Sequence, residues 1–328
     1  MEAWLLRRWY GGVAPGPGLR ALSALHGALL GLRDAAWRRG WFRAHRLPVP
    51  VVVVGNLVAG GTGKTPLTIA IAEHLAARGW RPGVVSRGYG RRSRTPVRVT
   101  SGTSAAACGD EPLLIARRTG LPVHVDRDRV AAARALVADG CTLIIADDGL
   151  QHRRLGRDVE IEVVDGVRRH GNGRLIPAGP LRGPAGRGVD LHVVNGGETR
   201  EGEWPMALEP GDVRAIDADA TRPLASFAPG PVHAIAGIGR PERFFATLRG
   251  AGIEVRPHAF PDHHAYVAPE LAFEPPLPRL MTGKDAVKCA GLGLRDAWEV
   301  PVDARLPAGF FAALDALLTD AGAARGHA

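Results

Sequence analysis

The sequence contains only three cysteines in 328 residues, Cys108, Cys141 and Cys289, and they stand far apart. An odd number of cysteines at such spacings forms neither a disulfide framework nor a zinc motif. We therefore expect a chain that folds around its own apolar core in a reducing cytoplasm. Apolar residues make up 45% of the chain, and its length allows two domains, each with its own core.

Long apolar runs are also missing. Between Arg20 and Arg33 lie twelve uncharged residues, ALSALHGALLGL, but a membrane span needs about 20. A secretory signal has an apolar segment of that length, yet the GLRDAAWRRGW that follows is a poor cleavage region. We therefore expect no transmembrane span and no export.

Acidic residues are scarce at the start of the chain. The first 46 residues hold eight arginines, four tryptophans and only two acids, so they supply +6 of the formal charge of +9. One apolar stripe at helical spacing runs along this segment: Leu22, Leu25, Leu29 and Leu32. The stripe either packs on the protein's own core, or it lies in the membrane interface with Trp and Arg against anionic lipid. No nucleic-acid-binding motif accompanies the charge, so we expect no nucleic-acid partner.

The stretch VAGGTGKTP, residues 58–66, resembles a phosphate-binding loop with one departure. The pattern G-x-x-x-x-G-K-[ST] places a glycine where this chain has Val58. The frame around it is nevertheless the expected one, because a buried-strand pattern, PVPVVVVGN, precedes it and a helix pattern, TPLTIAIAEHLAARGW, follows it. Lys64 is expected to reach the β- and γ-phosphates and Thr65 to ligate Mg²⁺. The predicted ATP site comprises Val58, Ala59, Gly60, Gly61, Thr62, Gly63, Lys64 and Thr65.

A second strand pattern ends in two acids. The segment CTLIIADDGLQH, residues 141–152, is an apolar run closed by Asp147 and Asp148. P-loop enzymes hold Mg²⁺ with an acid at such a strand end, opposite the loop threonine. We therefore predict that Asp147 and Asp148 support the metal beside Thr65, although acids at a strand end are otherwise turn or helix-cap residues. Between the phosphate-binding loop and this segment, VVSRGYGRR (84–92) is predicted to be a strand that leads into a glycine-rich basic turn.

Together these segments resemble the tetraacyldisaccharide 4'-kinase family, which phosphorylates the 4'-hydroxyl of an acylated glucosamine disaccharide 1-phosphate in the lipid A pathway. Several of the matching segments are long and unlike generic phosphate-loop signatures. Members of the family carry the GGTGKT form without a glycine at the position of Val58, so the departure is a family trait. The matching segments are GNLVAGGTGKTP, SRGYGRRS, GDEPLLIA, PVHVDRDRVAAA, DDGLQH, GNGRLIPAGPLRGP, FPDHHAY and TGKDAVK.

The resemblance implies roles that the residue pattern alone leaves open. Asp110 in GDEP corresponds to the family's catalytic base for the sugar hydroxyl, although without the family it would be taken as a helix N-cap. His263 in DHH corresponds to the partner that positions this carboxylate, with His264 as the alternative ring. Lys64 and Glu111 complete the expected catalytic set. Contacts with the acceptor or the nucleotide are expected from Arg182, Arg87, Tyr89 and Arg127.

Two positions depart from the pattern of the family. Gly183 follows Arg182 where the family usually has glutamate, and Gly283 stands where TEKDAVK would place glutamate. The first departure removes a carboxylate of the expected metal network, so that role falls to Asp147, Asp148 or water. Neither departure removes the phosphate loop or the expected base.

Strand and helix patterns alternate from residue 48 to about 195 and restart at residue 231. This predicts an α/β fold of the P-loop NTPase type, with a mainly parallel sheet covered by helices on both faces and a smaller C-terminal α/β domain. Because Asp110 and His263 fall in different domains, the site is expected between them, where closure excludes water. The predicted parts are an amphipathic basic membrane-interface segment (1–46), a kinase core (47–200), a connection (201–230) and a lid domain (231–328).

The resemblance implies an enzyme that uses ATP and Mg²⁺ to convert the lipid A disaccharide 1-phosphate precursor into lipid IVA. It would bind peripherally to the anionic cytoplasmic face of the bacterial inner membrane, without a protein partner. Other functions fit parts of the sequence. A P-loop GTPase or metallochaperone would need the guanine-reading motif N-K-x-D, which is absent. A kinase for a soluble metabolite fits poorly with the basic, Trp-rich start, and a non-catalytic membrane-binding module remains as a third alternative.

Overall fold

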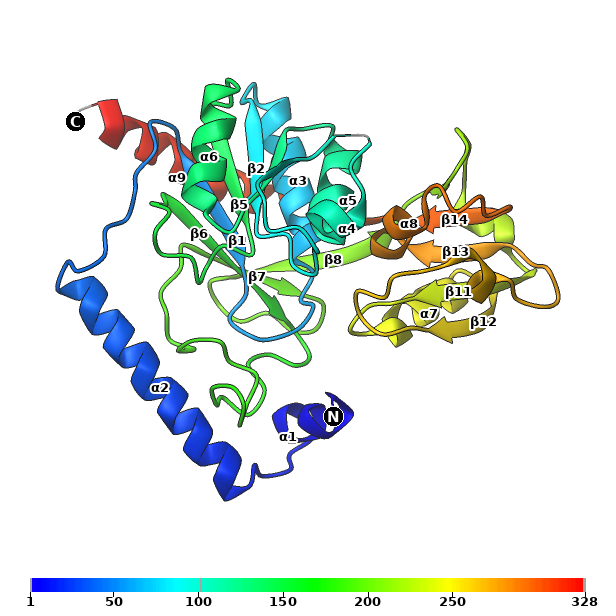
Figure 1. Ribbon diagram of the computed structural model, residues 1–328, viewed down its shortest axis with the longest axis horizontal. Coiled ribbons are helices and arrows are strands. Elements are labelled where there is room, and N and C mark those ends of the chain that lie inside the picture. The colour runs from blue at the N-terminus through cyan, green and yellow to red at the C-terminus, as the bar shows by residue number, and fades with distance from the viewer. Residues whose placement is uncertain (1, 101, 327–328) are drawn as a thin grey trace.

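The computed structural model describes residues 2–100 and 102–326. Met1, Ser101, His327 and Ala328, which the predicted segments include, lie outside the described residues. Two β-sheets organise the chain (Figure 1). The larger sheet has the strand order β15-β8-β7-β6-β1-β5-β2-β4-β3, and the smaller has the order β10-β9-β14-β13-β11-β12.

The centre of the larger sheet is parallel and buried. β1 (Val51–Gly55) lies between β5 (Leu143–Asp147) and β6 (Val159–Asp165), and every residue of β1 and β5 is buried. A strand covered on both faces needs apolar residues at nearly every position, which explains the runs VVVV and LIIA. The parallel register pairs Val54 with Asp147, so the carboxyl ends of these strands meet at one edge of the sheet. The remaining strands are β2 (Pro82–Ser86), β3 (Val97–Arg98), β4 (Val123–Val125), β7 (Leu191–Asn195), β8 (Glu203–Pro210) and β15 (Val302–Arg305).

Helices cover both faces of this sheet. On one face, Leu67, Ile115 and Phe310 of three helices share a buried cluster with Val52. On the other face, the helix that carries Leu136 packs in a second cluster. The predicted P-loop-type α/β fold is therefore confirmed. The helices on the first face are α3 (Lys64–Ala77), α5 (Asp110–Thr119) and α9 (Ala308–Gly326), with the short α4 (Ala105–Cys108) before α5, and α6 (Arg129–Ala138) covers the second face.

The smaller sheet forms a second domain beside the first (Figure 1). β11 pairs in parallel with β12 and β13, and the buried side chains of Phe245 and Leu248 belong to the core of this domain. Its strands are β9 (Val213–Ala215), β10 (Thr221–Arg222), β11 (Pro231–Ala236), β12 (Glu254–Ala259), β13 (Arg279–Thr282) and β14 (Ala297–Val300). Its helices are α7 (Pro241–Gly250) and α8 (Gly283–Cys289), with 3₁₀ turns η1 (Leu224–Phe227) and η2 (Ala268–Leu271).

The predicted domain boundaries require correction in two places. β8, inside the expected connection 201–230, pairs with β7 and so belongs to the larger sheet. β15 and α9, inside the expected lid domain 231–328, also return to the larger sheet, because β15 pairs antiparallel with β8 and α9 buries Phe310 and Leu314 in its core. The chain thus leaves the large domain after β8 and re-enters it at β15, and the two strands form one ribbon between the domains.

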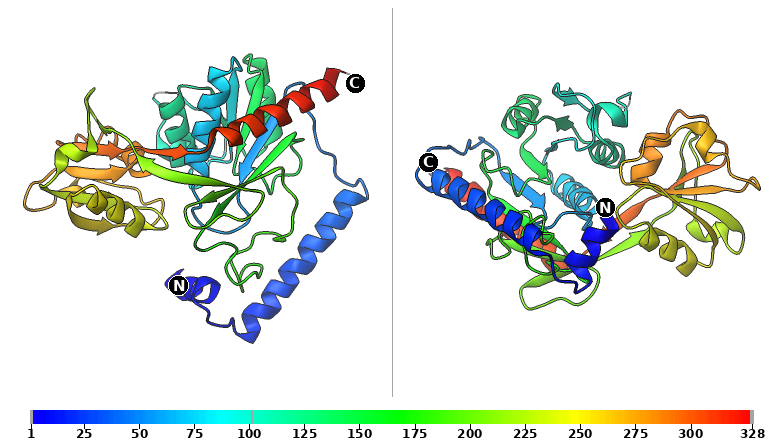
Figure 2. Two further views of the ribbon diagram at one scale, coloured as in Figure 1. Left: turned by 180° about the vertical axis from the view of Figure 1, so that it is seen from behind. Right: turned by 60° about the horizontal axis from the view of Figure 1, so that its bottom comes forward.

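The first 46 residues carry two helices, α1 (Glu2–Tyr10) and α2 (Pro17–Arg38). Figures 1 and 2 show α2 standing away from the body of the protein. It contacts residues 175 and 176 through polar groups, since Ser23 Oγ donates to the Leu175 carbonyl at 2.9 Å and His26 Nδ1 lies 3.0 Å from the Ile176 carbonyl. Packing of the leucine stripe on the protein's own core is excluded, because its four side chains face solvent. Leu22, Leu25, Leu29 and Leu32 are 55%, 58%, 56% and 68% exposed.

No helix within the described ranges is long and apolar enough to cross a membrane. The three cysteines are buried and free.

Candidate active site

The phosphate loop, residues 58–66, leads from β1 into α3. Gly60 and Gly63 adopt positive φ angles of 111° and 96°, which favour glycine. Space is also limited at Gly63, because a Cβ there would lie 2.6 Å from Nδ2 of Asn195, which donates to the Thr62 carbonyl at 2.9 Å. Gly63 immediately precedes α3, so the loop ends at a helix N-terminus whose free N–H groups and dipole favour phosphate.

Val58 and Ala59 hold the loop in place rather than line its phosphate-facing turn. The Val58 side chain is buried in a cluster with Leu57 and Leu181, and Val58 forms a bridge with Leu181. The N–H of Ala59 donates to the Pro180 carbonyl at 2.8 Å, so in this conformation it is not free for phosphate. The missing glycine has a physical reason here, since a glycine at position 58 would remove a packed side chain from the core.

Lys64, Asp148 and Arg182, three predicted site residues, meet at the base of the loop. Lys64 Nζ lies 3.8 Å from Asp148, and Arg182 donates to both oxygens of Asp148 at 2.9 and 3.1 Å. Burial opposes the ionisation of Asp148, but Lys64 and Arg182 outweigh it and hold the pKa of this carboxyl far below its usual value. Asn56, which the sequence reading missed, joins this network: it is fully buried, accepts from Lys64 Nζ at 3.2 Å and accepts from Arg182.

Asp147 is buried beside this network at the end of β5. Its Oδ1 accepts from Thr68 Oγ1 at 3.2 Å, and its Oδ2 has no hydrogen-bond partner among the described residues. Burial, with the negative charges of Glu111 and Asp148, raises the pKa of Asp147 to about 7. A buried carboxylate oxygen without a donor is a position that a bound cation can satisfy. The described residues contain no group of three or more His, Cys, Asp or Glu side chains arranged to hold a metal.

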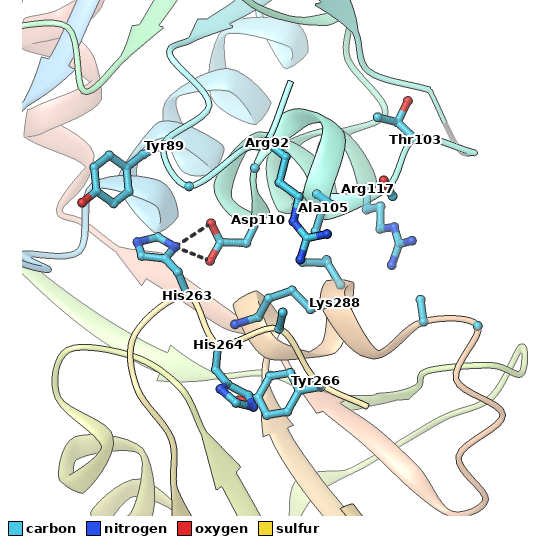
Figure 3. A pocket seen from close by; sticks show the side chains of 18 of the residues that line it. Tyr89, Arg92, Thr103, Ala105, Asp110, Arg117, His263, His264, Tyr266 and Lys288 are labelled. Carbon is cyan, nitrogen blue, oxygen red and sulfur yellow. Dashed lines mark hydrogen bonds and ion pairs between the residues drawn. The ribbon is translucent and has the colours of Figure 1, made fainter. Parts of the chain in front are cut away.

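Asp110 and His263 come together across the two domains, as the resemblance implied (Figure 3). His263 Nδ1 lies 3.0 and 3.2 Å from the two oxygens of Asp110. Asp110 is the first residue of α5, after the N-cap Gly109, and its Oδ1 also accepts from the Glu111 N–H at 3.0 Å. His264 is not the partner, because its Nε2 lies 3.0 Å from Glu270.

The electrostatics of this pair favour a charged carboxylate. Burial opposes ionisation of Asp110, but the hydrogen bond from His263 and the charge of Lys284 outweigh it and lower its pKa. The same hydrogen bond, against the opposing effect of burial, raises the pKa of His263. His263 also has a positive φ of 60°, a backbone strain typical of positions that the surrounding structure fixes for function.

Glu111, the second acid of α5, forms an ion pair with Lys284 of α8. The sequence reading assigned no role to Lys284, although it lies in the family-like segment TGKDAVK. Burial disfavours both charges, but each stabilises the other, so the pKa of Glu111 is lowered and that of Lys284 is raised. The positive charge of Lys284 also acts on Asp110 and Asp147. Lys284 is therefore a small-domain cation that belongs to the site.

Two cavities flank these residues. The first, here called the arginine cavity, measures about 470 Å³. All four residues predicted to contact the acceptor or the nucleotide line it, together with Glu111 and Asp148. Its polar lining includes Arg87, Tyr89, Arg127, Arg129, Gln151 and Arg182.

The second cavity, here called the Asp110 cavity, measures about 550 Å³ and lies between α5 and the small domain (Figure 3). Asp110, His263 and Tyr89 line it, and the rings of Tyr89 and His263 are 5.0 Å apart. Tyr89 lines both cavities.

The two glycine departures differ in their surroundings. A Cβ at Gly183 would meet nothing within 4 Å, so only the carboxylate of the family's usual glutamate is lost there. At Gly283 a Cβ would lie 3.0 Å from Oε1 of Glu299 and 3.1 Å from Leu114. The side chain of Glu299 thus occupies space that a residue at position 283 would need.

Comparisons with known proteins identify the family of the chain. The profile of the family described as Tetraacyldisaccharide-1-P 4'-kinase matches residues 17–319. A protein named Tetraacyldisaccharide 4'-kinase from Stenotrophomonas maltophilia (strain R551-3) is 54% identical over 318 residues, covering 93% of this chain and 94% of that protein. One of the same name from Xanthomonas euvesicatoria pv. vesicatoria (strain 85-10) is 54% identical over 321 residues, covering 93% of each chain.

A solved structure extends the likeness to the fold. LpxK from Aquifex aeolicus, in complex with ATP, is 27% identical and matches with a TM-score of 0.77, covering 91% of this chain and 98% of that one. The match therefore extends over most of the chain. On the strength of a family profile and of relatives that match nearly its whole length, this chain belongs to the tetraacyldisaccharide-1-P 4'-kinase family.

Proposed function

We propose that this protein carries out the reaction for which its family is named, with Asp110 as the base. The γ-phosphoryl group of ATP is transferred to the 4'-hydroxyl of a tetraacyldisaccharide 1-phosphate, which gives lipid IVA in lipid A biosynthesis. The observation that supports this most is the Asp110–His263 pair, held across two domains next to a phosphate loop. A sugar hydroxyl needs a positioned proton acceptor, while the rest of the catalysis comes from alignment and charge.

The residues act in sequence on one proton and one phosphoryl group. Asp110 accepts the proton of the 4'-hydroxyl while the hydroxyl oxygen forms a bond to the γ-phosphorus. The bond from that phosphorus to the bridging oxygen breaks, and ADP leaves. His263 holds the Asp110 carboxylate in place through Nδ1. Lys64 and Arg182 offset the charge of the phosphates, and both are already directed there by Asn56 and Asp148.

Mg²⁺ is the second cofactor in this proposal. Thr65, Asp147 and Asp148 would hold it, with Asp147 contributing the oxygen that has no donor among the described residues. When bound, Mg²⁺ neutralises part of the charge on the β- and γ-phosphates. Since Asp148 also pairs with Arg182, we expect Asp147 to contribute more to metal affinity. Gly183 supplies no side chain, so water would fill the position of the family's usual glutamate.

The acceptor is an anionic lipid, and residues 1–46 suit the surface that carries it. The leucines of α2 face outward, and Trp4 and Trp41 are 48% and 72% exposed. Exposed arginines lie at both ends of the helix, among them Arg20, Arg38 and Arg39. Such a helix buries its apolar face at the boundary of the acyl chains while its cations meet lipid phosphates. We place the protein on the cytoplasmic face of the inner membrane, where ATP is present.

Phosphoryl transfer from γ-labelled ATP to the purified disaccharide lipid tests the proposal. Lys64→Ala should lose activity mainly through nucleotide handling, and Asp110→Asn should lower kcat with little change in KM for ATP, because the base acts only in the transition state. Asp262→Asn provides a matched control, since this exposed acid lies next to His263 and contacts it at 3.8 Å. Full activity of Asp110→Asn would show that another group takes the proton.

A further inference from the structure

The turns between β6 and β7 connect the N-terminal helices with the phosphate loop. From the end of β6 at Asp165 to the start of β7 at Leu191, the chain forms turns and isolated bridges rather than helices or strands. Contacts with neighbouring segments therefore fix its path. Residues 171–182, here called the strap, contact α1 and α2 with their first half and the phosphate loop with their second half (Figure 1).

Three side chains of the N-terminal helices contact three consecutive carbonyls of the strap, those of residues 175–177. Ser23 Oγ donates to the first at 2.9 Å, His26 Nδ1 lies 3.0 Å from the second, and Trp9 Nε1 donates to the third at 3.0 Å. A carbonyl oxygen only accepts, so the nitrogen of His26 that faces it carries the proton. Donors from two separate helices thus converge on one short stretch of backbone.

Asn172 links α1 to the turn within the strap. Its N–H donates to the Trp9 carbonyl at 2.9 Å, and its Nδ2 donates to the carbonyls of Arg8 and Ala178 at 3.1 and 2.8 Å. A Cβ at Gly179 would collide with Oδ1 of Asn172, so the backbone must approach this side chain closely. The same amide therefore holds α1 and closes the turn of the strap.

Leu181 joins the two halves of the strap to the phosphate loop. Its N–H donates to the Arg174 carbonyl at 3.1 Å, and its carbonyl accepts from the Ile176 N–H at 2.9 Å. Leu181 also forms a bridge with Val58 of the phosphate loop. A continuous path of backbone contacts therefore runs from the N-terminal helices through the strap to this loop.

The path ends on groups that bind ATP in the proposed function. The Ala59 N–H donates to the Pro180 carbonyl at 2.8 Å, and the Arg182 N–H donates to the Leu57 carbonyl at 2.7 Å. The second bond fixes the backbone that carries the guanidinium paired with Asp148. A shift of the strap would thus displace both the phosphate loop and Arg182, and displacements of about 1 Å are enough to weaken a site that depends on alignment.

We propose that Trp9, Ser23 and His26 are positioning residues for ATP: they hold the strap, and the strap holds the phosphate loop and Arg182. This inference rests on the proposed function in one respect, the binding of ATP at that loop. The leucines of α2 are exposed, whereas Ser23 and His26 contact the strap. Lipid binding and ATP positioning thus use different side chains of one helix, and the positioning operates without lipid.

The test measures the Kd of a non-hydrolysable ATP analogue by isothermal titration, with the full-length protein in detergent micelles without phospholipid. The variants are Trp9→Phe, Ser23→Ala, His26→Phe and the triple substitution, each of which removes the donor group and keeps an apolar side chain. Ser23→Thr is the conservative counterpart, because it keeps the hydroxyl. Val13→Ala is the control within the same segment, since Val13 is 47% exposed and lies between α1 and α2.

We expect the Kd to rise about 2- to 5-fold in the single variants and about 10-fold or more in the triple variant, because losing one neutral hydrogen bond changes an equilibrium about 5-fold. Ser23→Thr and Val13→Ala should bind like the wild-type protein. Amide hydrogen exchange follows the route of the effect. The N–H groups of Ala59 and Arg182 should exchange faster in the triple variant, since their partners lie in or against the strap.

Three results would overturn the proposal. The first is a folded triple variant with the Kd of the wild-type protein. The second is weaker binding without faster exchange at Ala59 and Arg182, because the effect would then not pass through the strap. The third is a lower unfolding midpoint and a smaller fraction of binding protein at unchanged Kd, which would assign the three side chains a merely structural role.

The proposed function can fail separately from this inference. A wild-type protein that does not bind the ATP analogue contradicts the proposed function and, with it, the positioning role. A wild-type protein that binds the analogue no more tightly than the triple variant retains the proposed function and contradicts only the positioning role.

Discussion

Replacing Leu25 and Leu29 together by glutamine tests whether the exposed face of α2 binds lipid. Their side chains are 58% and 56% exposed, and the contacts of the helix with the body come from the polar side chains of Ser23 and His26. Glutamine is a good helix former, so α2 should persist. The change therefore removes apolar surface from the outward face and leaves the contacts with the protein intact.

The expected magnitude follows from the exposed surface. Moving a fully exposed leucine into an apolar phase contributes about 1.5–3 kcal/mol. With a little over half of each side chain exposed, the two leucines contribute about 2 kcal/mol, which corresponds to ~30-fold in a partition coefficient. The arginines of the segment attract anionic lipid with about 1 kcal/mol each near the surface, and salt screens this part alone. The double variant should therefore bind about 30-fold more weakly with an unchanged salt dependence.

Cosedimentation with vesicles of phosphatidylglycerol and phosphatidylethanolamine measures this partitioning. Val267→Gln is the matched control, since Val267 is 55% exposed but lies in the small domain. Equal unfolding midpoints of the variants exclude a folding defect. A folded double variant that binds the vesicles as tightly as the wild-type protein would refute the assignment of this face to the membrane.

Three further predictions concern the contacts between and within the domains. Lys284→Met should lower kcat and destabilise the protein by about 1.5–3 kcal/mol, because the half-buried Glu111 loses its charged partner. Adding Glu111→Gln should restore most of the stability in urea unfolding, and a double variant no more stable than Lys284→Met would contradict the pairing. Because Asp110 raises the pKa of His263, the stabilisation from this ring is complete below about pH 6.5 and is lost as the pH rises through the raised pKa. The difference in unfolding free energy between wild type and His263→Gln should therefore be larger at about pH 6 than at about pH 9, and the opposite trend would contradict the geometry. Asp285→Ala should lower the free energy of unfolding by about 3–5 kcal/mol, measured in thermal or urea unfolding. The carboxylate of Asp285 is fully buried, pairs with Lys288 and accepts hydrogen bonds from the Gly237 N–H, Tyr266 and Thr282. A loss below about 1 kcal/mol, the scale of an exposed ion pair, would show that these contacts are weak.

Local patterns in the sequence predict the centre of the fold well. The apolar runs of β1 and β5 and the helix pattern of α3 each depend on residues close in sequence, and the structure places them as predicted. The position of the acid at the end of β5 could be predicted from the same strand pattern, because the carboxyl ends of the strands in a parallel sheet lie at the edge where ligands bind. The Asp110–His263 contact was implied only by the family resemblance, since no local pattern links two residues 153 positions apart.

Long-range pairing explains what the sequence could not predict. β15 is four residues long and pairs with β8 far earlier in the chain, so its short pattern gives no sign of which sheet it joins. Asn56 and Lys284 act through partners that only the folded chain brings near, respectively Arg182 and Glu111. Local sequence also cannot predict whether the leucine stripe of α2 faces the core or solvent, because a helical pattern identifies an apolar face but not what covers it.

A crystal structure with a non-hydrolysable ATP analogue and the disaccharide acceptor bound would test the proposed chemistry most directly. We expect an oxygen of Asp110 within about 3 Å of the 4'-hydroxyl, with that hydroxyl in line with the γ-phosphorus above Lys64. An acceptor bound in that complex with its 4'-hydroxyl far from Asp110 and next to another base would contradict the proposed role of Asp110.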